Sequence, residues 1–179
     1  MANADETPDR EMAWLEAVMD RHEGPLVRYA ARIVGDVDRA RDVVQDTFVR
    51  LWRSDRRGSD DRLDAWLFAV CRNRALDVRR KERRMTRLSE PDVAGRPDVA
   101  PSPAAAAEQS DTSVRVAAAM AELPPRQQEV LRLKFQNGLA YKQIAEVTGL
   151  SVSNVGFLIH RGLSQLRQRF QAAGLIGEG

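Results

Sequence analysis

The sequence predicts an all-α protein of two small helical domains joined by a flexible linker. On both sides of the linker, apolar residues recur at intervals of three and four positions, as in amphipathic helices. The sequence lacks the alternating β-branched runs that indicate strands, and Asn-Gly occurs once, at Asn137-Gly138. Between residues 88 and 111 the periodicity stops, and four prolines and a run of alanines replace it.

Seven helices are predicted around this linker, which is long for a connection inside one compact domain. The first domain is expected to hold helices near 11–34, 38–56 and 62–85, and the second helices near 113–122, 125–136, 140–147 and 152–170. Pro124-Pro125 opens the second helix of the second domain, as a first-turn proline can. The predicted organisation is a disordered acidic tail (1–10), a first domain (11–87), a linker (88–111), a second domain (112–172) and a short tail (173–179).

The placement of charge is more informative than its total. The 179 residues carry 28 Lys and Arg against 26 Asp and Glu, a net charge of +2. Acidic residues dominate the first twenty-four positions, whereas arginines and one lysine crowd residues 72–87. A polyanion would therefore be attracted to the second of these segments and repelled by the first.

The residue types that carry most catalysis are scarce. Cys71 is the single cysteine, and His22 and His160 are the only histidines, so neither a disulfide nor a zinc-finger spacing can be assembled. Nothing is placed to activate a nucleophile, so we expect no enzyme, no metal and no cofactor. No apolar stretch is long enough to span a bilayer or to form a signal peptide. We therefore expect a soluble cytoplasmic protein without membrane insertion.

Residues 140–170 have the pattern of a helix-turn-helix. A short amphipathic helix is followed by a turn, in which Gly149 supplies a left-handed residue and Ser151 an N-cap, and then by a longer helix. The inward stripe of the longer helix is predicted to be Val152, Val155, Ile159, Leu163 and Leu166. Its opposite face, which offers the side chains of a major-groove reader, holds Ser153, Asn154, Phe157, Arg161, Ser164 and Gln168, with His160 at the margin. The alternative is a helical hairpin with a solvated polar face.

The third predicted helix is apolar first and basic afterwards. Leu67, Val70, Cys71 and Val78 share one face, which would complete a core, and Arg72, Arg79, Arg80 and Arg83 share the other, which could lie on phosphates. A solvated arginine-rich helix end would have the same pattern.

The second predicted helix has an outer face that indicates a protein partner. Ala40, Val43, Val44, Thr47 and Leu51 turn inward, whereas the outer face carries Asp42, Gln45, Asp46, Val49, Trp52 and Arg53. A tryptophan beside a valine on a polar surface is typical of a protein interface. The alternative is that Trp52 folds back onto the first helix.

Three stretches, in this order, resemble the sigma-70 family of sigma factors, extracytoplasmic-function (ECF) group. Residues 40–53 (ARDVVQDTFVRLWR) are similar to the helix that family members dock on the clamp helices of the polymerase β′ subunit. The run from Trp66-Leu67 through Asn73, Asp77 and Arg80 is similar to the segment that melts and reads the −10 promoter element. Residues 123–131 (LPPRQQEVL) with the helix-turn-helix are similar to the domain that reads the −35 element.

The resemblance implies a sigma-2-like domain, a sigma-4-like domain and a non-enzymatic factor that binds core RNA polymerase and directs initiation at −35 and −10 elements of promoter DNA. The implied partners are the β′ clamp helices, the β flap, promoter DNA and an anti-sigma factor. The residues expected to bind core polymerase are Asp42, Gln45, Asp46, Val49 and Trp52. Those expected at the −10 element are Arg72, Asn73, Asp77, Arg79, Arg80, Arg83 and Arg84, with Asn73 and Asp77 placed to grip a flipped base. Those expected at the −35 element are Arg126, Ser151, Ser153, Asn154, Phe157, His160 and Arg161.

The sequence departs from the family at Gly156 and Phe157, where many members carry Lys or Arg followed by a small hydroxyl residue. The family's −35 sequence preference is therefore not carried over. A rival interpretation is a LuxR-type activator, whose helix-turn-helix also has a stretch like residues 126–131 and a histidine like His160. Its usual α/β N-terminal domain is missing, since residues 38–85 are helical and basic. A helical scaffold that binds only protein would lack salt-dependent affinity for DNA.

Overall fold

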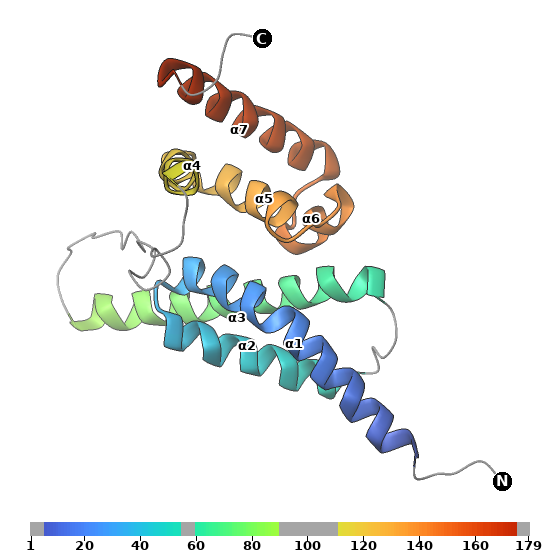
Figure 1. Cartoon of the computed structure of the whole chain (residues 1–179). Coiled ribbons are helices and arrows are strands. Elements are labelled where there is room, and N and C mark those ends of the chain that lie inside the picture. The colour runs from blue at the N-terminus through green and yellow to red at the C-terminus, as the bar shows by residue number, and fades with distance from the viewer. Residues whose placement is uncertain (1–5, 55–59, 90–110, 175–179) are drawn as a thin grey trace. The chain divides into compact units, whose positions relative to one another are not determined.

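A computed structural model describes residues 6–54, 60–89 and 111–174. The chain divides into two compact units, Met1–Val99 and Ala100–Gly179. The described residues form seven α-helices and no strand, which confirms the all-α prediction (Figure 1). They are α1 (Glu6–Val34), α2 (Val37–Trp52), α3 (Asp60–Ser89), α4 (Asp111–Ala121), α5 (Pro125–Phe135), α6 (Tyr141–Thr148) and α7 (Val152–Ala172). Most of the predicted linker, 90–110, and the outer parts of both predicted tails lie outside the described residues.

Three helix ends lie four or five residues from the predicted ones, and the others lie within two. The backbone is helical from Glu6, so the last five residues of the predicted disordered tail belong to α1; acidic residues and a proline are both favourable in a first helical turn. The second helix stops at Trp52 instead of 56, because the Ser54 hydroxyl and amide both donate to the Leu51 carbonyl. The third runs on to Ser89, since residues 81–88 are good helix formers and the first proline comes at Pro91.

The first unit is a bundle of three helices, in which α1 and α3 both run from right to left in the view of Figure 1, with crossing axes, and α2 runs in the opposite direction. A turn at Gly35, which has a φ of +82°, leads into α2, and Asp36 caps that helix by accepting the Arg39 N–H at 2.8 Å. The Tyr29 and Phe68 rings pack edge to face with centroids 5.3 Å apart, joining α1 to α3. The buried core includes Leu26, Ala40, Val43, Val44, Thr47, Phe48, Leu51, Leu67, Phe68, Cys71 and Ala75.

The second unit packs α5, α6 and α7 around one core. Gly138 and Gly149 both have positive φ values, +71° and +73°, and end α5 and α6 in tight turns. The predicted turn chemistry is confirmed, because Gly149 is left-handed and the Ser151 hydroxyl accepts the Asn154 N–H. The buried core includes Leu123, Val130, Leu131, Leu133, Leu139, Ile144, Val147, Val155, Ile159 and Leu166.

The predicted inward stripe of α7 is wrong at two positions. Val155, Ile159 and Leu166 are buried as expected, but Val152 is 48% and Leu163 43% exposed. The buried position between Ile159 and Leu166 is Gly162, where an added Cβ would lie 2.8 Å from Leu131 Cδ1. Close contact with α5 at this glycine turns the neighbouring Leu163 off the packed face, and Val152 lies in the first turn, ahead of the contact.

Cys71 is a core residue. It is fully buried, and its thiol lies 3.9 Å from the Leu26 carbonyl oxygen. Burial raises the pKa of the Cys71 thiol to about 12, against a smaller opposite effect of a hydrogen bond with Thr47. Because the raised pKa lies far above neutral, the thiolate stays scarce in the folded protein.

We predict that Cys71 of the folded protein resists alkylation by iodoacetamide from about pH 7 to about pH 9, the range in which an ordinary thiol begins to ionise. Full labelling is expected once denaturant unfolds the first unit. Mass spectrometry of the labelled protein checks this, and native-state labelling that rises steeply over that pH range would contradict it.

Candidate nucleic-acid interface

The C-terminal half of α3 presents a basic surface. Its core face holds Cys71 and Ala75, while Val70 and Val78 are half-buried. Arg72 and Arg79 are half-buried, and the exposed residues include Asn73, Asp77, Arg80, Lys81, Arg83 and Arg84. The predicted division of this helix into an apolar face and a basic face is therefore present in the fold, and the basic face is accessible to a polyanion.

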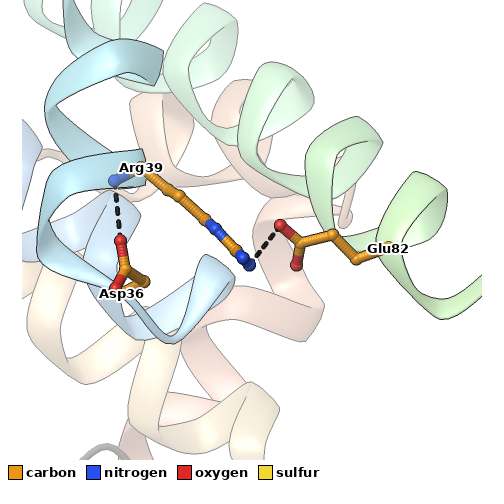
Figure 2. Close-up of polar contacts among 3 residues, drawn as sticks. All are labelled: Asp36, Arg39 and Glu82. Atoms are coloured by element: carbon orange, nitrogen blue, oxygen red, sulfur yellow. Dashed lines mark hydrogen bonds and ion pairs between the residues drawn. The ribbon is translucent and has the colours of Figure 1, made fainter. Parts of the chain in front are cut away.

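The two acidic residues of this segment are both paired with arginines. Asp77 pairs with Arg80 at 3.2 Å, and Glu82 pairs with Arg39, which reaches across from the first turn of α2 (Figure 2). The Arg39 backbone is held by the Asp36 cap, so one residue links the start of α2 to the far end of α3 (Figure 2). Surface pairs of this kind stabilise a fold by about 1 kcal/mol or less, but they neutralise carboxylates that would otherwise repel phosphates.

The outer face of α2 combines acidic and apolar side chains. Asp42 and Gln45 are exposed, and Val49 and Trp52, neighbours at a spacing of three, are 41% and 42% exposed. A large part of the Trp52 side chain therefore remains outside the core. A half-exposed tryptophan beside a valine, with carboxylates around them, fits a protein partner better than a solvated face.

Asp46 belongs to that face and also contacts the basic helix. Its Oδ2 accepts a hydrogen bond from Arg74 Nε of α3 at 2.8 Å, and both side chains stay partly exposed. Sequence reasoning missed Arg74 as a residue of this surface. The missing signal is tertiary, because the two positions lie in different helices and no spacing within either helix predicts their contact.

The exposed face of α7 carries the residues expected of a major-groove reader. Ser153, His160 and Arg161 are exposed, Phe157 is 57% exposed, and Asn154 is half-buried. The Arg161 guanidinium lies 6.0 Å from the Phe157 ring centroid, within reach of a cation–π interaction. Arg126 is also exposed, in the first turn of α5.

Two aromatic residues of this unit also remain exposed and were not singled out from the sequence. Phe135, the last residue of α5, is 61% exposed, and Tyr141, the first of α6, is 39% exposed. Lys134 Nζ lies 5.5 Å from the Tyr141 ring centroid. Both residues lie at helix ends, where hydrophobic periodicity does not reliably predict whether a side chain is buried or exposed.

The described residues contain no cluster of three or more His, Cys, Asp or Glu side chains that could hold a metal ion. Among these same residues, no helix combines the length and the apolarity that crossing a membrane requires.

Comparison with known proteins identifies the family. Residues 18–85 match the model described as Sigma-70 region 2, and residues 113–166 match Sigma-70, region 4. The chain is 32% identical over 178 residues to ECF RNA polymerase sigma factor SigL of Mycobacterium tuberculosis (strain ATCC 25618 / H37Rv), covering 98% of this chain and 99% of SigL. The chain belongs to the ECF group of the sigma-70 family.

Solved structures agree with this assignment. The sigma factor RpoE in complex with the anti-sigma factor NepR from Bartonella quintana matches with a TM-score of 0.68 and 26% identity, over 87% of this chain and 96% of RpoE. CnrH in complex with the cytosolic domain of CnrY matches with a TM-score of 0.54 and 30% identity, over 88% of each chain.

As an ECF sigma factor, the protein directs RNA polymerase to promoters and is not an enzyme. This confirms the predicted family and function class, and it excludes the LuxR-type interpretation. The region 2 match covers α2, nearly all of the described α3 and the larger part of α1, so it contains the predicted polymerase and −10 residues. The region 4 match covers α5, α6 and most of α7, so it contains the predicted −35 residues. The roles of the individual residues stay predictions.

Gly156 of the sigma factor's α7 is open to substitution. A Cβ added there would lie 3.5 Å from Tyr141 Cε2, an ordinary contact, so Gly156→Ala is expected to stabilise the second unit by about 1 kcal/mol through helix propensity. Gly162→Ala is the matched control, because its methyl group would lie 2.8 Å from the buried Leu131. Urea unfolding checks the difference, and equal stabilities of the two variants would contradict it.

Proposed function

We propose that this sigma factor binds core RNA polymerase through the outer face of α2, opens and reads the −10 element with α3, and reads the −35 element with α7. The observation that carries the proposal is that three exposed faces of different chemistry lie in the matched sigma regions. The face of α2 is acidic and apolar, that of α3 is basic, and that of α7 is polar with one aromatic.

Polymerase would engage α2 through two kinds of contact. Val49 and Trp52 supply half-exposed apolar area of the kind that forms the energetic centre of an interface. Asp42, Gln45 and Asp46 supply polar and acidic groups for the β′ clamp helices, and they set orientation and association rate.

The −10 element would be held by α3 in two ways. The arginines Arg72, Arg79, Arg80, Arg83 and Arg84 bind phosphates of the melted strand, which gives affinity without sequence information. Asn73 and Asp77 are both exposed and lie one helical turn apart, so they can receive the edge of one base. Capture of that base repays an unstacking cost of a few kcal/mol.

The −35 element would be read in the major groove by α7. Arg161 can donate two hydrogen bonds to the edge of a guanine, Asn154 can pair bidentately with adenine, and the Phe157 ring can contact a thymine methyl group. Ser151, Ser153 and His160 lie at or near the N-terminal half of the helix, and Arg126 of α5 is placed for phosphate contact.

Two units that each bind DNA weakly are sufficient for promoter recognition when both are attached to one polymerase. The predicted Pro- and Ala-rich linker makes the binding of the second unit effectively intramolecular once the first is docked, so the preferences for the two elements multiply. The linker would then set the reach between the elements.

Further partners follow from the family. The second unit would contact the β flap of polymerase. An anti-sigma factor is also proposed, because the similar structures of RpoE and CnrH are both structures of complexes, and the partner of RpoE is the anti-sigma factor NepR. We place the protein in the bacterial cytoplasm, where core polymerase and promoter DNA are found.

Run-off transcription from a promoter library tests the proposal. Purified core polymerase with the full-length protein should give specific start sites that core polymerase alone does not, and the sequences selected should share a −35 and a −10 motif. If specific starts require another sigma factor in the reaction, the protein is not acting as the promoter-recognition subunit.

A further inference from the structure

An arginine stripe on α1 has no assigned role. Arg21, Arg28 and Arg32 are exposed and separated by seven and four positions, so they line one side of the helix. At 1.5 Å per residue they extend over about 16 Å, the axial length of four to five phosphates of one duplex strand at about 3.4 Å each. The nearby acidic residues Asp20 and Glu23 lie about 100° and about 160° around the helix from Arg21.

The three arginines are not neutralised by their surroundings. None of them forms an ion pair or a hydrogen bond through its side chain with another described residue, and no position three or four residues away within α1 is acidic. Partial burial and the neighbouring charge of Arg28 lower the pKa of the Arg32 guanidinium. Two guanidinium groups that repel each other on an exposed face form a site that an anion would stabilise.

Gly24 makes room for one of these side chains. A Cβ atom at Gly24 would lie 3.3 Å from Arg28 Nη1, so the Arg28 guanidinium lies close against the helix backbone, on the side of Arg21. Between Arg21 and Arg32 the described chain exposes no large apolar side chain. A protein interface needs apolar or aromatic anchors, so this stripe fits a phosphate backbone better than a protein surface.

The stripe belongs to a helix that packs directly on α3. Tyr29 of α1 packs on Phe68 of α3, and the two helices both run from right to left in the view of Figure 1, with crossing axes. Arg32 follows Tyr29 by three positions and Arg72 follows Phe68 by four, so each is the next residue along the same side of its helix. Both arginines therefore lie within about one helical turn of the Tyr29–Phe68 contact that joins α1 to α3.

We infer that Arg21, Arg28 and Arg32 bind DNA phosphates and extend the DNA track of the first unit from α3 onto α1. This inference rests on the proposed function, because it takes the basic face of α3 as the start of that track. It assigns α1 a sequence-independent contact with promoter DNA next to the −10 element.

The test is the salt dependence of promoter binding by the preformed holoenzyme, with the triple variant R21Q/R28Q/R32Q. Each lost phosphate contact lowers the magnitude of the negative slope of log K against log salt concentration by about 0.7 to 0.9, so the loss of three contacts should lower it by about 2 to 3. The triple variant R21K/R28K/R32K keeps the charges and should keep the slope. Thermal unfolding should show no loss of stability in either variant, because these arginines form no ion pair with the described residues that the substitutions could break.

Three results would overturn the inference. They are an unchanged slope in the glutamine variant, a slope lost equally in the lysine variant, and a fall in affinity for core polymerase with unchanged promoter binding, which would make the stripe a protein-binding face. Failure of the proposed function is seen separately, because the wild-type holoenzyme would then form no promoter-specific complex.

Discussion

Asp46→Arg is expected to lower the affinity for core RNA polymerase by about 100-fold or more, the size of a lost interfacial charge pair. Asp46 lies at the centre of the proposed polymerase face of α2, with Gln45 beside it and Val49 three positions on. The substitution would bring a second cation next to Arg74, whose guanidinium now donates to Asp46 at 2.8 Å. The new charge would therefore repel Arg74 and leave any cationic group of the partner unpaired.

The effect on polymerase must be separated from the effect on the fold. Arg74→Gln removes the same ion pair without placing a new charge, and since exposed pairs contribute about 1 kcal/mol or less, it should change stability slightly. Asp42→Arg reverses an exposed charge on the same face and should also weaken binding. Titration of labelled protein with core polymerase measures all three, with thermal unfolding in parallel. Equal losses of affinity for Arg74→Gln and Asp46→Arg would show that the ion pair, and not the surface charge, matters.

Most of the fold could be predicted because it depends on periodicity within helices. All seven helices of the described residues were predicted, and the five α2 residues predicted to turn inward, from Ala40 to Leu51, are buried, with Phe48 the one buried position of α2 that was missed. The turn between α6 and α7 could also be predicted, because a left-handed residue such as Gly149 and an N-cap such as Ser151 each act within one helical turn.

What could not be predicted depends on contacts between helices. Leu163 follows the helical stripe in sequence, yet the close approach of α5 at Gly162 decides which side of α7 is packed. The pairs Asp46–Arg74 and Arg39–Glu82 join positions that are 28 and 43 residues apart. Their partners follow only from how α2 lies against α3, and the Tyr29–Phe68 contact between α1 and α3 has the same origin.

The environment of Trp52 could not be predicted from amino-acid composition. A tryptophan at the end of an amphipathic helix can fold onto a neighbouring helix or remain available to a partner, and the two alternatives have the same sequence pattern. Its 42% exposure, together with that of Val49, favours the partner. The resemblance to sigma factors had pointed the same way, but the physical reason is visible only in the fold.

Leu133→Ala is expected to destabilise the second unit by about 2 to 5 kcal/mol, because Leu133 is fully buried in α5 and the substitution leaves a cavity. A helical unit of this size has little stability to lose, so most molecules should unfold there. Since the two units have separate cores, the first should stay folded and still bind core polymerase.

Leu163→Ala is the matched control for this prediction, because it makes the same chemical change at a leucine that is 43% exposed in the same unit. Circular dichroism during thermal unfolding should show an early transition in the Leu133 variant only, with the helicity of the first unit retained. Run-off transcription should then lose its dependence on the −35 sequence while core binding persists. The linker would then carry an unfolded second unit, which cannot bind the −35 element. Loss of both units in one transition would show instead that they fold as a single cooperative body.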